Sequence, residues 1–220
     1  MGANGRGLKR VTKPKFCNKP GLKPMKTLDW YPTSSPDGRK IAFERRCEPP
    51  NQPEYLLNPN VYVMNANGKR QRRLFAHGEM PSCAPSGGKI AFFVPTHGAN
   101  WGKLVVRSVS GGPAEVLDGG GVGASRPDWS PDGQRLAFEA YWPDEDTDAV
   151  WTISTGGGAP LFVAQGGRPS YSPDGQRVVF EDVDFNSNSL GFDALLYLVN
   201  LDGSGRTYLT RGSEPAWQPH

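Results

Sequence analysis

A turn sequence, Ser-Pro-Asp-Gly followed by a short apolar run, recurs along the chain and constrains its fold more than any other feature. Intact copies are SSPDGRKIAFE from Ser34, WSPDGQRLAFE from Trp129 and YSPDGQRVVFE from Tyr171, and a weaker copy, CAPSGGKIAFF, starts at Cys83. The closing residues AWQPH match the start of a fifth copy. The aligned prolines, about 42 to 49 residues apart, are Pro36, Pro85, Pro131, Pro173 and Pro219. Such self-similarity at a steady period indicates repeated supersecondary units.

Each repeat has the pattern of four short strands. The apolar run after the turn predicts one strand, and a second, such as VYVMNANG from Val61, follows a variable loop and ends in a Gly-containing turn. A last strand ends at Leu74, Val116, Phe162 or Leu209. With the strand that leads into the turn, this predicts a four-stranded antiparallel β-propeller blade. Four aromatic residues, one at the same step of each repeat, are expected to be buried: Phe43, Phe92, Phe138 and Phe180.

The predicted fold is therefore all-β, a propeller of four complete blades with a blade-closing strand at each end. The 28 Gly and 21 Pro among 220 residues argue against long helices, and 36% hydrophobic residues suffice for a core. The blades are expected at about 29–75, 80–118, 126–164 and 168–210. Residues 1–12 are expected to be the last strand of a preceding blade, and 213–220 the first strand of a following one.

The repeat core, S-P-D-G-x-[KR]-[ILV]-[AV]-F, with the following strand that ends in N-x-[DN]-G, resembles the repeat of TolB-like β-propeller proteins. Members of that family include the periplasmic Tol–Pal component, and similar propellers accompany prolyl-oligopeptidase-type peptidases. The resemblance implies a propeller, usually six-bladed, with a binding role. Four blades leave exposed edges, so we expect a fragment of a larger propeller, or ends completed by another chain through self-association.

Loop lengths predict which face binds a partner. The turns at one end of the blades are short, whereas the other end has the longer segments 45–60, 94–102, 140–148 and 182–193, with 13–29, 76–81, 118–126 and 164–168 between blades. Function concentrates in long loops on a rigid scaffold. The candidate contacts to a protein or peptide partner are Tyr141, Trp142, Asp144, Asp146, Arg126 and Arg168. The alternative is that these loops are tolerated insertions on a purely structural repeat.

Charge argues against nucleic-acid binding, and hydropathy argues against membrane insertion. The net charge is only +3, and the lysines between Lys13 and Lys26 have no interleaved aromatic residues, so a solvated connector is favoured over a nucleic-acid contact. No apolar run has the length of a membrane span. No signal peptide is visible at the N-terminus, and the compartment would be periplasmic or extracellular if the natural start lies further upstream.

Motifs of catalysis and of metal binding are largely absent. There is no G-x-S-x-G elbow or P-loop, and the three histidines fall in separate blades, so the prediction is a non-enzyme without a cofactor. The alternative is the propeller portion of a larger enzyme, such as a prolyl-oligopeptidase-type peptidase. Cys17, Cys47 and Cys83 have no C-x-x-C spacing, and reduced, buried thiols are expected.

One loop has a spacing that suits weak calcium binding. Alternating oxygen ligands closed by a carboxylate at the twelfth position suit Ca²⁺. The candidate ligands are Asp182, Asp184, Asn186, Asn188 and Asp193. Ser187 replaces the usual turn glycine and the closing residue is Asp rather than Glu. An acidic surface loop that binds nothing is the alternative.

Overall fold

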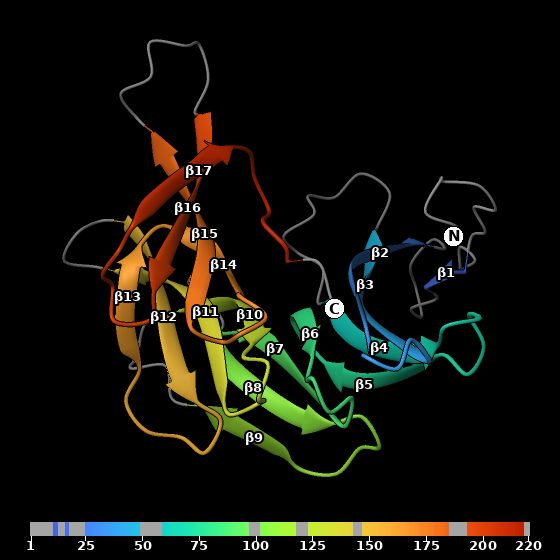
Figure 1. Ribbon diagram of the computed structural model, residues 1–220. Helices are drawn as coiled ribbons and strands as arrows, with labels where there is room; N and C mark the ends of the chain where they lie inside the picture. The colour runs from blue at the N-terminus through green and yellow to red at the C-terminus, as the bar shows by residue number, and fades with distance from the viewer. Residues whose placement is uncertain are drawn as a thin grey trace.

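The computed structural model describes residues 11–12, 16–17, 25–48, 59–96, 102–117, 123–142, 147–184 and 193–217, and these contain strands and no helix. The strands form four antiparallel sheets that follow one another in chain order, from blue to red in Figure 1. Blade 1 contains β1 (Phe16–Cys17), β2 (Met25–Ser34), β3 (Lys40–Glu48), β4 (Asn60–Asn65) and β5 (Arg72–Ala76). The other three blades have four strands each.

Blade 2 contains β6 (Glu79–Cys83), β7 (Lys89–Pro95), β8 (Gly102–Ser108) and β9 (Ala114–Leu117). Blade 3 contains β10 (Ala124–Trp129), β11 (Arg135–Trp142), β12 (Thr147–Ser154) and β13 (Leu161–Gln165). Blade 4 contains β14 (Gly167–Tyr171), β15 (Arg177–Asp184), β16 (Asp193–Asn200) and β17 (Thr207–Arg211). This arrangement confirms an all-β fold of four antiparallel blades.

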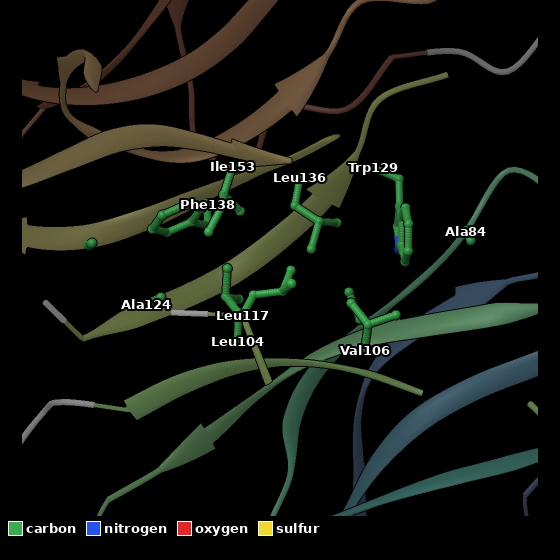
Figure 2. Close-up of a cluster of buried hydrophobic side chains, with 11 residues drawn as sticks. Ala84, Leu104, Val106, Leu117, Ala124, Trp129, Leu136, Phe138 and Ile153 are labelled. Atoms are coloured by element: carbon green, nitrogen blue, oxygen red, sulfur yellow. The ribbon is translucent and has the colours of Figure 1, made fainter. Parts of the chain in front are cut away.

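The cores lie between neighbouring blades rather than within one. Phe138 of blade 3 packs into a cluster with Leu104 and Val106 of blade 2, and Figure 2 shows these side chains facing one another. Blades 1 and 2 share a second cluster, and blades 3 and 4 a third. The four repeated aromatics, Phe43, Phe92, Phe138 and Phe180, are at most 2% exposed, which confirms that they occupy equivalent buried positions.

Hydroxyl–carboxylate contacts fix the Ser-Pro-Asp-Gly turns. In blade 3, Ser130 Oγ donates to Asp132 Oδ1 at 2.6 Å and accepts the Arg135 backbone N–H at 2.9 Å. The same bonds occur at Ser35 and Ser172. The glycine of each turn has φ between 65° and 71°, a conformation that glycine adopts without steric cost. Hydrogen bonds from the Ser130 hydroxyl and the Gln134 N–H lower the pKa of Asp132.

Several strands extend into segments that were predicted to be loops. β1 and the first residues of β2 lie inside the predicted loop 13–29. β3 continues to Glu48 and so offers cross-strand partners to Lys26 and Thr27, and β1 pairs in turn with this start of β2. β13 and β14 are separated only by Gly166, within the predicted loop 164–168. Of the predicted strand 1–12, only 11–12 are described, and they are not in a strand.

The prediction of reduced cysteines is wrong for Cys47, which is disulfide-bonded, whereas Cys83 is free. Disulfide formation depends on which residues the fold brings together, and the spacing of cysteines along the sequence does not report this. The described part of the chain holds no helix long and apolar enough to cross a bilayer.

Candidate binding site at the centre of the blades

Five dipeptides ending in proline mark the same step of every repeat. They are Tyr31-Pro32, Met80-Pro81, Arg126-Pro127, Arg168-Pro169 and Glu214-Pro215. The residue before each proline has a φ between 47° and 55°. Positive φ is a true outlier for bulky side chains and costs about 1–3 kcal/mol per residue. Because the same strained conformation recurs in all five copies, it is a structural feature of the repeat.

Each dipeptide in the four sheets coincides with a β-bulge. The pairing between the first and second strands slips between Trp30 and Thr33 in blade 1 and between Ser125 and Asp128 in blade 3, with equivalent slips in blades 2 and 4. Proline cannot donate to a strand ladder and is tolerated at bulges. A bulge re-aims side chains. The result is a fixed backbone that can present a different side chain in each repeat.

Glutamates from the preceding blade hold three of the five strained residues. Glu44 Oε2 accepts the Met80 N–H at 3.1 Å, and Glu139 Oε2 accepts the Arg168 N–H at 2.9 Å. Glu181 Oε2 accepts the N–H of Glu214 at 3.1 Å. Each of these glutamates directly follows one of the buried phenylalanines. A Cβ on Gly167 would lie 2.4 Å from Glu139 Oε2, so a larger residue here would have to displace this carboxylate.

Segment 213–217 follows the same path without strand pairing. Its Glu214 has the left-handed φ of the equivalent residues. The Trp217 Nε1–H donates to the Ser170 carbonyl at 3.2 Å, just as the Trp129 Nε1–H donates to the Ser82 carbonyl at 3.1 Å. The first strands of all four blades and this segment therefore surround one central region.

A cavity of about 320 Å³ lies in that region. Its lining consists of the five dipeptides and the residues Ser82, Asp128, Ser170 and Ala216. Tyr31 and Met80 make one side of this central cavity apolar, while Arg126 and Arg168 contribute positive charge on the other. Burial raises the pKa of Asp128 to about 6, although its Oδ2 accepts the Tyr171 N–H at 2.8 Å.

The two arginines are positioned by carboxylates and by a ring. Arg168 Nη1 lies 2.9 and 2.8 Å from the two carboxylate oxygens of Glu181. Arg126 Nε lies 3.5 Å from Glu139 Oε2, and its Cζ lies 5.9 Å from the centroid of the Tyr31 ring. Burial raises the pKa of Glu139, and the Arg168 N–H and the Arg126 charge offset this only in part.

A second cavity of about 310 Å³ adjoins the two arginines between blades 3 and 4. Arg126, Arg168 and Tyr141, three of the predicted contact residues, line it together with Glu139 and Asp148. Tyr141 and Asp148 are cross-strand partners of β11 and β12. The Trp142 side chain, Asp144 and Asp146 lie outside the described residues.

Calcium binding stays a prediction. The Asp182 carboxylate pairs with the Arg206 guanidinium, and Asp184 lies opposite Asp193 in the register of β15 and β16. Asn186 and Asn188 lie outside the described residues. Among residues that are described, no group of three or more His, Cys, Asp or Glu side chains is arranged to hold a metal ion.

Three central residues, Tyr31, Met80 and Glu214, were absent from the predicted site. A sequence signal for them exists, because in all five copies a second proline stands four residues before the proline of the turn: Pro32, Pro81, Pro127, Pro169 and Pro215. The Phe-Glu pair that ends three of the apolar runs is a second signal.

Comparison with known proteins relates the chain to two kinds of propeller protein. No family model matches. TolB from Acinetobacter baumannii superposes with a TM-score of 0.66 at 22% identity, over 86% of this chain and 45% of that chain. The fold is a TolB-like β-propeller.

Peptidases are also similar to this propeller. The uncharacterized peptidase YuxL of Bacillus subtilis is 29% identical over 109 residues, which are 48% of this chain and 16% of YuxL. The acylaminoacyl peptidase of Pyrococcus horikoshii superposes with a TM-score of 0.58 at 15% identity, covering 84% of this chain and 32% of that chain. The chain thus spans less than half the length of these relatives.

Proposed function

We propose that this propeller is a non-catalytic binding scaffold that holds a segment of a protein or peptide partner in its central cavity. The observation that carries the proposal is the ring of strained residues before proline. Their backbone is the same in every repeat, while their side chains differ in size and charge: Tyr31, Met80, Arg126, Arg168 and Glu214. Strained backbone of this kind clusters at ligand clamps and active sites.

Rigidity of the lining supports this proposal. The N–H groups of Met80, Arg168 and Glu214 are each fixed by a glutamate of the preceding blade. A site whose backbone is already ordered loses little conformational entropy when a ligand enters. The adjoining cavity between blades 3 and 4 enlarges the surface that a partner segment can contact.

A second candidate function is the propeller portion of a larger peptidase. The likeness to YuxL and to the acylaminoacyl peptidase favours it. Sequencing the coding region on both sides would test this candidate: an adjoining hydrolase domain supports it, and further Ser-Pro-Asp-Gly repeats alone contradict it.

A peptide-display selection against the chain would test the binding scaffold. Peptides that use the central cavity should bind at least about tenfold more weakly to Met80→Ala, because Met80 lines the cavity and a large contact residue is lost. Val116→Ala, which truncates a 56% exposed side chain on β9, serves as the control. Selected peptides that bind both variants as well as the unmodified chain would contradict the proposal.

A further inference from the structure

The central cavity has two chemically different sides, and this difference limits what can fill it. Tyr31 and Met80 come from blades 1 and 2, and Arg126 and Arg168 from blades 3 and 4. We infer that the cavity selects a peptide segment in which a carboxylate lies next to an apolar side chain, as in a hydrophobic residue at a free C-terminus. This inference rests on the proposed binding function.

The arginines retain donors for a ligand carboxylate. A guanidinium has five N–H donors, and its planar geometry matches a carboxylate. Arg168 uses one nitrogen, Nη1, for both oxygens of Glu181. Arg126 approaches Glu139 through Nε at 3.5 Å. Among the described residues, the Nη2 group of each arginine makes no such contact.

The two glutamates beside the arginines are shared with backbone groups. Glu139 also accepts the Arg168 N–H, and Glu181 also accepts the Glu214 N–H. The carboxylate oxygens of both glutamates therefore contact a backbone N–H of the next blade as well as a guanidinium group. A ligand carboxylate can therefore bind the Nη2 groups of the arginines while the glutamates keep their hydrogen bonds to the backbone.

Two acidic residues, Asp128 and Glu214, also line the cavity. Asp128 is turned toward blade 4, where its carboxylate oxygen Oδ2 accepts the Tyr171 N–H at 2.8 Å. The Glu214 side chain is exposed, so water screens its charge. The lining thus has two positive and two negative side chains, so we expect a ligand carboxylate to be held by direct hydrogen bonds from the guanidinium Nη2 groups rather than by net charge.

The apolar side is suited to a hydrophobic side chain. Met80 has a flexible, polarizable thioether that adapts to irregular shapes. The Tyr31 ring lies under the Arg126 guanidinium at 5.9 Å from Cζ, so the apolar and cationic sides meet at this pair. A C-terminal residue such as Phe could reach both sides at once.

The test uses three synthetic peptides and the methyl signal of Met80 in a chain labelled with ¹³C-methyl methionine. The probes are acetyl-Gly-Gly-Gly-Phe as the free acid, the same peptide as its C-terminal amide, and acetyl-Gly-Gly-Gly-Gly as the free acid. Met80→Leu assigns the signal. We expect the Phe free acid to shift the Met80 methyl at about millimolar concentration, and the other two probes to bind about tenfold more weakly.

Arginine variants then test the charge. In Arg126→Met and Arg168→Met, which keep the apolar stem, the preference for the acid over the amide should fall to nearly one. Arg39→Met should keep the full preference, because Arg39 is an exposed residue of a Ser-Pro-Asp-Gly turn. Melting temperatures of all variants report whether each one folds, and the acid–amide comparison on the unmodified chain does not depend on them.

Equal binding of acid and amide at the Met80 methyl would overturn this inference while leaving the binding scaffold intact. The absence of any Met80 shift with the Phe free acid at about 5 mM would overturn it as well. Failure of the scaffold itself would be seen separately, as display-selected peptides that are indifferent to Met80→Ala.

Discussion

At the scale of single residues, two adjacent positions in the second strand of a blade have different roles. Phe138 is fully buried in the core between blades 2 and 3. The next residue, Glu139, faces the opposite side of β11 and accepts the Arg168 N–H of blade 4. The alternation of side chains along a strand thus connects one residue pair to both neighbouring blades. Blade 2 has Phe93 where the other blades have glutamate.

Truncation of the core aromatic should be costly. We expect Phe138→Ala to lower the free energy of unfolding by about 3–5 kcal/mol, because it removes a fully buried ring and leaves a cavity. Phe162→Ala, at a side chain 41% exposed, is the matched control. Urea denaturation followed by circular dichroism measures both. A loss below about 1 kcal/mol for Phe138→Ala would mean that its packing is misassigned.

The buried Asp128 should make stability depend on pH in an unusual direction. Its pKa rises from 3.8 to about 6 on folding, so between these values the native state binds more protons than the unfolded state. Its contribution to stability therefore falls as pH rises from about 4 to 6. Asp128→Asn should remove this dependence and, relative to the unmodified chain, gain up to about 2–3 kcal/mol at pH 7.5.

Melting temperatures of both proteins across pH 4–8 would check this prediction. The difference between them isolates Asp128, because turn aspartates such as Asp132 have lowered pKa values and contribute the opposite slope. A constant difference across this range would contradict the assignment.

At the scale of elements, the repeat sequence predicts the blades well and their irregularities poorly. Turn residues and apolar runs specify the hairpins locally, which is why β3, β7, β11 and β15 fall where expected. At Met80, Arg168 and Glu214 the strained backbone N–H bonds to a glutamate of the preceding blade, and no local pattern reports that contact. Of the predicted site, Arg126, Arg168 and Tyr141 meet at one cavity, whereas Tyr31, Met80 and Glu214, the other three residues before proline, were missed.

Loss of one turn hydroxyl should weaken the hairpin that it organises. Ser130→Ala removes the donor to Asp132 and the acceptor for the Arg135 N–H at a residue only 4% exposed. We expect a loss of about 1–2 kcal/mol in the free energy of unfolding. Ser110→Ala, in the exposed turn before Gly111, should change it by less than about 0.5 kcal/mol. Equal effects of the two substitutions would contradict the role given to the Ser130 hydroxyl.

At the scale of the whole molecule, each blade packs on the next, and the last blade presents a face with no such cover among the described residues. Val163 of β13 and Leu209 of β17 occupy equivalent places, because Val163 follows Phe162, the partner of Trp151, and Leu209 follows Tyr208, the partner of Tyr197. Val163 is 2% exposed because blade 4 covers it, whereas Leu209 is 47% exposed. Burial at this position is therefore a property of the neighbouring blade rather than of the repeat.

This difference makes the last prediction a matched pair. Val163→Ala should lower the free energy of unfolding by about 1–3 kcal/mol, whereas Leu209→Ala, although it removes a larger side chain, should cost less than about 0.5 kcal/mol. Urea denaturation at two protein concentrations tenfold apart would measure both. If a second copy covers the face of blade 4 in solution, Leu209→Ala will be costly and its cost will grow with protein concentration. A large, concentration-independent cost for Leu209→Ala would instead mean that another part of this chain covers Leu209, contrary to its exposure in the structure.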